Sequence, residues 1–153
     1  MSYTEPDLEN ALLHLNKLDE NAQPNWGEIS AHRMVEHLTD TLNLAMGNLE
    51  KFPLQIPEDK IEKAQAFLFS EHPLPKNFEA SFAKKAVPTR TESISDAIDE
   101  FATTWVDFQD FFDADPNRTT FHPSFGELNY EKWLRLHSKH LTHHFQQFGL
   151  IEA

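Results

Sequence analysis

Four of the nine histidines in this chain lie close together near its C-terminal end. His140 and His144 are four residues apart, so on an α-helix they lie one turn apart on one face, a spacing that lets two imidazoles bind one metal ion. A helical wheel places His137 with His144 inside the apolar stripe of the segment and His140 at its edge. His143 is predicted to point to solvent. The spacing suggests a metal site, while ordinary buried or solvated histidines remain the alternative.

Two histidines of one helix need further ligands from another element. The segment after Ser30 carries two more histidines, and the wheel places His37 beside the apolar face but His32 away from it, in solvent. His37 is therefore the better inward candidate. Three others are set aside. His72 and His122 precede prolines, which favours extended loops, and His14 lies off the apolar stripe of its helix.

Four segments with helical periodicity could position these side chains. Ser30, Ser93 and Asn129 are suitable N-cap residues, and Gly149 is a natural residue just beyond a helix end. The apolar positions recur every three or four residues, as on the buried face of an amphipathic helix. The predicted helices cover about residues 5–18, 30–49, 93–112 and 130–148.

The stretch from residue 51 to residue 90 differs from these segments, because it contains five of the nine prolines. It is predicted to hold at most one short helix, around residues 58–69. Such a long connection allows the helices on either side to run parallel in a bundle. Signals for β-strands are weak, with no clean alternation of apolar and polar residues. The fold class expected is an all-α four-helix bundle with a long irregular crossover between its second and third helices.

Composition excludes several classes of function. The chain of 153 residues fits one domain, residues 1–153, with 13 basic and 25 acidic residues and a net charge of −12. That charge repels nucleic acid and anionic membrane surfaces. With no cysteine there is no thiolate nucleophile or disulfide, and no phosphate-binding glycine motif is present. No signal peptide or membrane-spanning segment is found, so a cytoplasmic location is expected.

Two motifs cover the regions around the second and fourth predicted helices. The first is Trp26-Gly27-x-Ile29-Ser30-Ala31-His32-x-Met34-Val35-x-His37-Leu38. The second is His122-Pro123-x-Phe125-Gly126-x-Leu128, followed by Trp133 and by His140-Leu141-x-His143-His144-x-x-Gln147-Phe148-Gly149. In order and spacing, the two motifs together resemble those of a mostly uncharacterised branch of the DinB-like (YfiT-like) superfamily of metal-dependent enzymes.

The resemblance implies a bundle of up-down-down-up type and a divalent ion held by His37, His140 and His144. Three imidazoles leave a coordination position open for water or a substrate. Imidazole ligands suit several transition metals, zinc and nickel being expected first. His137 is retained as a pocket residue or as a contact of the ligands. The family includes hydrolases and thiol-dependent transferases, so a low-molecular-weight thiol is a further expected cofactor.

The function expected is that of a metal-dependent hydrolase or thiol transferase acting on a small molecule, through metal-bound water or a metal-bound thiol. Gln147 could orient the bound group, with packing or a hydrogen bond at the helix end as an equal alternative. Trp133 and Trp26 could wall a pocket, but aromatic residues at helical spacing more often belong to the core. Glu36 and Asp40 could bind a ligand imidazole, but a solvated position is favoured for both. The alternative function is a non-catalytic bundle stabilised by its metal. Apolar bundle faces also allow a homodimer.

Overall fold

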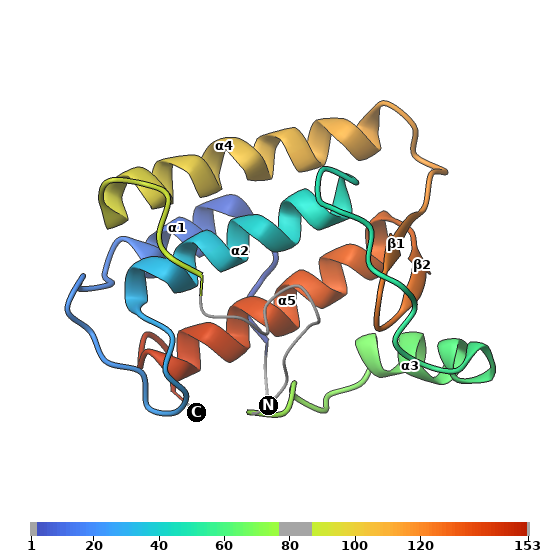
Figure 1. The fold of residues 1–153 in the computed structure, drawn as a ribbon, viewed down its shortest axis with the longest axis horizontal. Coiled ribbons are helices and arrows are strands. Elements are labelled where there is room, and N and C mark those ends of the chain that lie inside the picture. The colour runs from blue at the N-terminus through green and yellow to red at the C-terminus, as the bar shows by residue number, and fades with distance from the viewer. Residues whose placement is uncertain (1–2, 77–86, 153) are drawn as a thin grey trace.

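The computed structural model describes residues 3–76 and 87–152, which form five α-helices, a short 3₁₀ helix and a two-stranded antiparallel sheet (Figure 1). No helix in these two ranges is both long and apolar enough to cross a membrane. In chain order the elements are α1 (Leu8–Leu15), α2 (Ala31–Ala45), η1 (Glu58–Lys60), α3 (Ile61–Leu68), α4 (Ile94–Asp113), β1 (Thr120–His122), β2 (Gly126–Leu128) and α5 (Tyr130–Gln147).

The three longest helices begin at the residues that the sequence predicts. Ser30, Ser93 and Asn129 each lie in extended backbone conformation, and each side chain accepts a hydrogen bond from the backbone N–H three residues further on. These bonds satisfy donors that the first turn of a helix leaves free. Gly149 follows α5 with a φ of +68°, a conformation that glycine adopts without strain. The structure therefore confirms the starts of α2, α4 and α5 that the cap residues predict.

The prediction of a plain all-α four-helix bundle is wrong. A fifth α-helix, α3, follows η1 within the crossover, where the short helix was expected, and a β-hairpin precedes α5. In the hairpin Thr120 pairs with Leu128 and His122 pairs with Gly126, whose φ is +74°. Each strand is only three residues long, so the hairpin gives no alternating pattern that a sequence could reveal.

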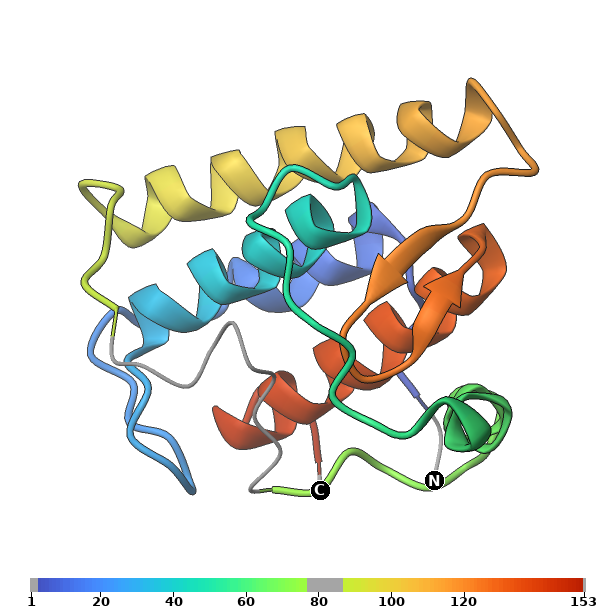
Figure 2. The ribbon, with the colours of Figure 1, turned by 45° about the vertical axis from the view of Figure 1, so that its right-hand side comes forward.

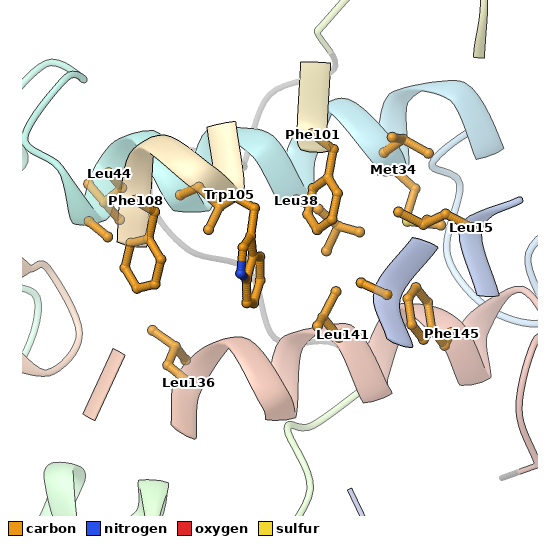
Figure 3. Close-up of a cluster of buried hydrophobic side chains, with 14 of the residues drawn as sticks. Leu15, Met34, Leu38, Leu44, Phe101, Trp105, Phe108, Leu136, Leu141 and Phe145 are labelled. Carbon is orange, nitrogen blue, oxygen red and sulfur yellow. The ribbon is translucent and has the colours of Figure 1, made fainter. Parts of the chain in front are cut away.

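Helix α2 lies between α4 and α5, with α1 packed against α4 and α3 against α5, as Figures 1 and 2 show. The hydrophobic core fills the space where α2, α4 and α5 face one another (Figure 3). Phe101, Trp105 and Phe108 project from α4 into this space, and Leu141 and Phe145 meet them from α5. The packing therefore fixes the facing sides of α2 and α5, which carry the histidines of interest.

Candidate metal centre

Three buried histidines from two helices meet in the interior. His37 lies on α2, and His140 and His144 lie one turn apart on α5; all three are 6–8% exposed. The Nε2 atom of His140 is 3.0 Å from Nε2 of His37 and 3.0 Å from Nε2 of His144. One ligand atom from each residue lies within 4.8 Å of the other two. We call these three residues the histidine cluster.

The spacing of the ring nitrogens suits a shared metal ion. With zinc–nitrogen distances of about 2.1 Å, two nitrogens bound to one ion lie about 3.0 Å apart at a right angle and about 3.4 Å apart in a tetrahedron. The distances from Nε2 of His140 to Nε2 of His37 and to Nε2 of His144, both 3.0 Å, match the right-angled arrangement. Three imidazole ligands from a protein leave a coordination position on such an ion for a further ligand.

A hydrogen bond to Gln147 fixes the ring orientation of His144. The Oε1 atom of Gln147 accepts from Nδ1 of His144 at 2.8 Å, so the proton lies on Nδ1 and the lone pair of Nε2 faces the cluster. The Nε2 atom of Gln147 donates to the backbone oxygen of Trp26 at 2.9 Å. Gln147 therefore positions a histidine of the cluster, and a contact of Gln147 with a bound group stays a prediction.

Glycine at position 27 permits this contact between the loop before α2 and the end of α5. Gly27 has a φ of +75°, and a Cβ atom placed there would lie 3.2 Å from Nε2 of Gln147. A larger residue would therefore be strained and would crowd the amide. The Trp26-Gly27 pair in the sequence thus has a structural explanation, because the Trp26 carbonyl must reach Gln147.

Burial keeps the histidine cluster uncharged. Desolvation, with smaller contributions from Arg33 and His143, lowers the pKa of His37 to about 4. Burial and the neighbouring histidines hold the pKa values of His140 and His144 well below the usual 6.5. Since the neutral imidazole is the form that binds a metal, the cluster is already in its binding form at pH 7.

His137 and Trp133 lie in a neighbouring group of rings rather than in the histidine cluster. The ring of His137 is stacked on Trp133 at 5.7 Å, meets Phe108 edge-on at 4.8 Å and lies 5.8 Å from Trp105. Trp133 donates its Nε1–H to Oγ1 of Thr120 at 2.8 Å. We call Trp105, Phe108, Trp133 and His137 the aromatic cluster. Burial, and then His122, lower the pKa of His137 to about 3.

The expectation that His143 points to solvent is wrong. Its side chain is only 8% exposed and meets His144 edge-on, with ring centroids 4.8 Å apart. The crossover covers this side of α5, since the backbone of Leu74 forms a hydrogen bond with His143. Trp26, which was considered as a pocket wall, is half-buried and packs against His143 at 5.6 Å.

Glu36 was expected at the surface but is completely buried. Its carboxylate accepts hydrogen bonds from the backbone N–H groups of Arg90 and Thr91 and from the Thr91 hydroxyl, so it attaches the chain before α4 to α2. These contacts outweigh the effect of burial and lower its pKa. No local pattern predicts this role, because Arg90 and Thr91 lie more than fifty residues away along the chain. Asp40 is half-buried and pairs with Arg33 at 2.6 Å.

The histidines that were set aside lie in four different settings. His72 is exposed, as is typical of a loop residue, and His14 is half-buried and stacked on Phe145 at 5.2 Å. His32 was expected in solvent but is also half-buried. Its Nε2 atom lies 2.6 Å from Oγ1 of Thr91. His122 is extended, as predicted, but it is buried in the hairpin with a pKa lowered to about 3 by desolvation.

Comparison with known proteins gives a family but no characterised relative. The search of curated proteins returned no match, and the search of solved structures returned none either. A family model described as "Protein of unknown function (DUF1569)" matches residues 1–149. The chain therefore belongs to the DUF1569 family.

Proposed function

We propose that His37, His140 and His144 bind one divalent transition-metal ion. The observation that carries this proposal is the convergence of three buried ring nitrogens, with two Nε2–Nε2 distances of 3.0 Å, on a point between α2 and α5. The lowered pKa values support it, because protons do not compete for these nitrogens at neutral pH. Zinc and nickel remain the ions we expect, since both accept imidazole ligands readily.

We further propose that the metal centre is catalytic and acts on a small molecule, as a hydrolase or a thiol-dependent transferase. A bound divalent ion would supply Lewis acidity and would lower the pKa of a bound water or thiol. His37, His140 and His144 would hold it, and Gln147 would keep His144 in the tautomer that binds. The motif resemblance to the DinB-like superfamily supports this chemistry. In this proposal the catalytic group is the metal-bound water or the metal-bound thiol.

The second candidate function is a metal-stabilised bundle without catalysis. It is favoured by the burial of the histidine cluster, whose members are at most 8% exposed and so offer a substrate little access. In this case the ion would join α2 to α5, and its binding free energy would contribute to folding. The same residues serve both functions, so activity and stability must be measured on the same preparations.

Metal analysis of the purified protein tests the site. We expect close to one ion per chain in the wild type and close to none in His37→Ala and in His140→Ala. His72→Ala, at an exposed histidine outside the cluster, is the matched control and should retain the ion. A wild-type protein without stoichiometric metal, loaded or native, would refute the site. Metal-dependent turnover in hydrolase and thiol-transfer screens would favour catalysis, and its absence beside a large loss of stability on chelation would favour the structural function.

A further inference from the structure

A small cavity lies between α2, α4 and α5, directly beside the histidine cluster. Its volume is about 10 Å³, close to the space that one water molecule requires. Four apolar side chains line it together with three rings that carry nitrogen, those of Trp105, His137 and His140. All of these side chains are buried. Trp105 reaches the space from α4 and faces α5, as Figure 3 shows.

Two of the three rings have a buried polar atom without a hydrogen-bond partner. In the described part of the chain, Nε1 of Trp105 and Nε2 of His137 are both buried and both unpartnered. Their ring centroids are 5.8 Å apart, and both rings line the cavity. Buried polar groups in folded proteins almost always find a partner in the protein or in ordered water. These two atoms therefore indicate a polar occupant in the cavity.

The third ring belongs to the histidine cluster. Its Nε2 atom faces His37 and His144, and none of the side-chain hydrogen bonds within residues 3–76 and 87–152 involves Nδ1 of His140. An imidazole that binds a metal through Nε2 carries its proton on Nδ1, and that N–H is usually donated to an acceptor. For His144 the acceptor is Gln147, whereas no residue in the described part of the chain accepts from Nδ1 of His140.

We propose that one ordered water molecule occupies this cavity and connects the aromatic cluster to the histidine cluster. It accepts hydrogen bonds from Nε1–H of Trp105 and Nδ1–H of His140 and donates one to Nε2 of His137, the three bonds typical of a buried water. The bond from His140 rests on the metal site proposed above, but the bonds to Trp105 and His137 do not. Trp105 and His137 are then positioning residues that act on His140 through the water.

Two of the three tryptophans provide the test and its control. In protein labelled with ¹⁵N at tryptophan, the indole N–H of Trp105 should show a cross-peak to water with the sign of a long-lived internal molecule. Trp133 is the matched control, because it is also fully buried but donates directly to Thr120. Its N–H should show no such cross-peak. A Trp105 signal without a water cross-peak would overturn the proposal.

A variant and a crystal structure make the test independent of one method. His137→Phe keeps the ring but removes the acceptor, so the water cross-peak of Trp105 should disappear while the Trp133 signal stays in place. A cross-peak that persists in this variant would overturn the bridge. If the variant does not fold, a high-resolution structure of the wild type decides, since it must show a water within hydrogen-bond distance of both Trp105 Nε1 and His137 Nε2.

Recording the spectra with and without added zinc separates this inference from the proposed function. The Trp105 cross-peak is expected in both samples, because its bonds to Trp105 and His137 need no metal. If zinc does not bind but the cross-peak is present, only the metal site fails. If zinc binds and the cross-peak is absent, only the water fails. When both hold, His137→Phe should weaken zinc affinity by 10- to 100-fold, about the effect of losing a partner of a ligand.

Discussion

The histidine cluster and the aromatic cluster share helix α5, and both contain buried histidines with lowered pKa values. In the first, Nε2 of His140 lies 3.0 Å from Nε2 of His37 on α2 and 3.0 Å from Nε2 of His144. In the second, His137 lies one turn away and is surrounded by the rings of Trp105, Phe108 and Trp133. The histidines of both clusters are buried, so burial does not distinguish them. The number of nitrogens that converge decides which of them can bind a metal.

The largest expected effect is on the stability contributed by the metal. Chelation should lower the free energy of unfolding of the wild type by about 4 kcal/mol when the free metal had been 1,000-fold above its dissociation constant. His140→Ala should show no response to the chelator, because it lacks a ligand. Urea unfolding with and without chelator measures both. A chelator response in the variant equal to that of the wild type would contradict the comparison.

Truncation in the aromatic cluster should destabilise the protein without removing the metal. Phe108 is completely buried, and Phe108→Ala should cost about 3–5 kcal/mol because it leaves a cavity in the core. Denaturant unfolding measures the loss, and metal analysis should still give one ion per chain. Phe69→Ala is the matched control, since Phe69 is 44% exposed and its loss should change stability little. Loss of the ion in Phe108→Ala would show that the two clusters are not separable.

Removing the partner of His144 should weaken metal binding without abolishing it. Gln147→Leu deletes the acceptor at Nδ1 and should lower metal affinity by 10- to 100-fold, or about 1.4–2.7 kcal/mol. Titration with a competing chelator measures the change. Gln146→Leu, at the neighbouring half-buried position whose amide bonds to the Glu152 backbone, should leave the affinity unchanged. Equal affinities of both variants would exclude Gln147 as a positioning residue.

The smallest effect per step concerns a buried histidine outside the histidine cluster, whose contribution changes gradually with pH. The pKa of His122 is lowered to about 3 in the folded protein, so below about pH 6.5 the unfolded chain binds this proton first and stability falls. The stabilisation is complete above that pH and is lost as the pH falls towards 3. His122→Asn can still accept from the Ser124 N–H, which Nδ1 of His122 accepts at 2.9 Å, but does not titrate. As the pH falls from about 6.5 towards 3, the stability of His122→Asn should fall less steeply than that of the wild type. The two slopes should differ by about 1.4 kcal/mol per pH unit.

That prediction is checked by urea unfolding of both proteins at several pH values. The variant has a smaller side chain, so its absolute stability will be lower, and only the slope against pH is informative. Identical slopes would show that His122 does not stay neutral in the folded protein.

Local signals predict the helices well but predict their surroundings poorly. Caps at Ser30 and Asn129 and the spacing of His140 and His144 depend on neighbouring residues only, and the structure contains each of them. A helical wheel takes one helix alone, so it placed His143 in solvent although the crossover near Leu74 covers that side. The hairpin before α5 was missed because strands of three residues carry too little periodicity.

The amino-acid sequence by itself determined which segments form the long helices and that two histidines lie one turn apart on α5, because helix caps and periodicity are local properties. Only the tertiary structure decided that His37, more than a hundred residues before His140 in the chain, joins them, with its Nε2 atom 3.0 Å from Nε2 of His140. It also decided that Glu36 is buried and that Trp105 and His137 share a cavity with His140. Contacts of this kind depend on how α2, α4 and α5 pack together, which no single segment specifies.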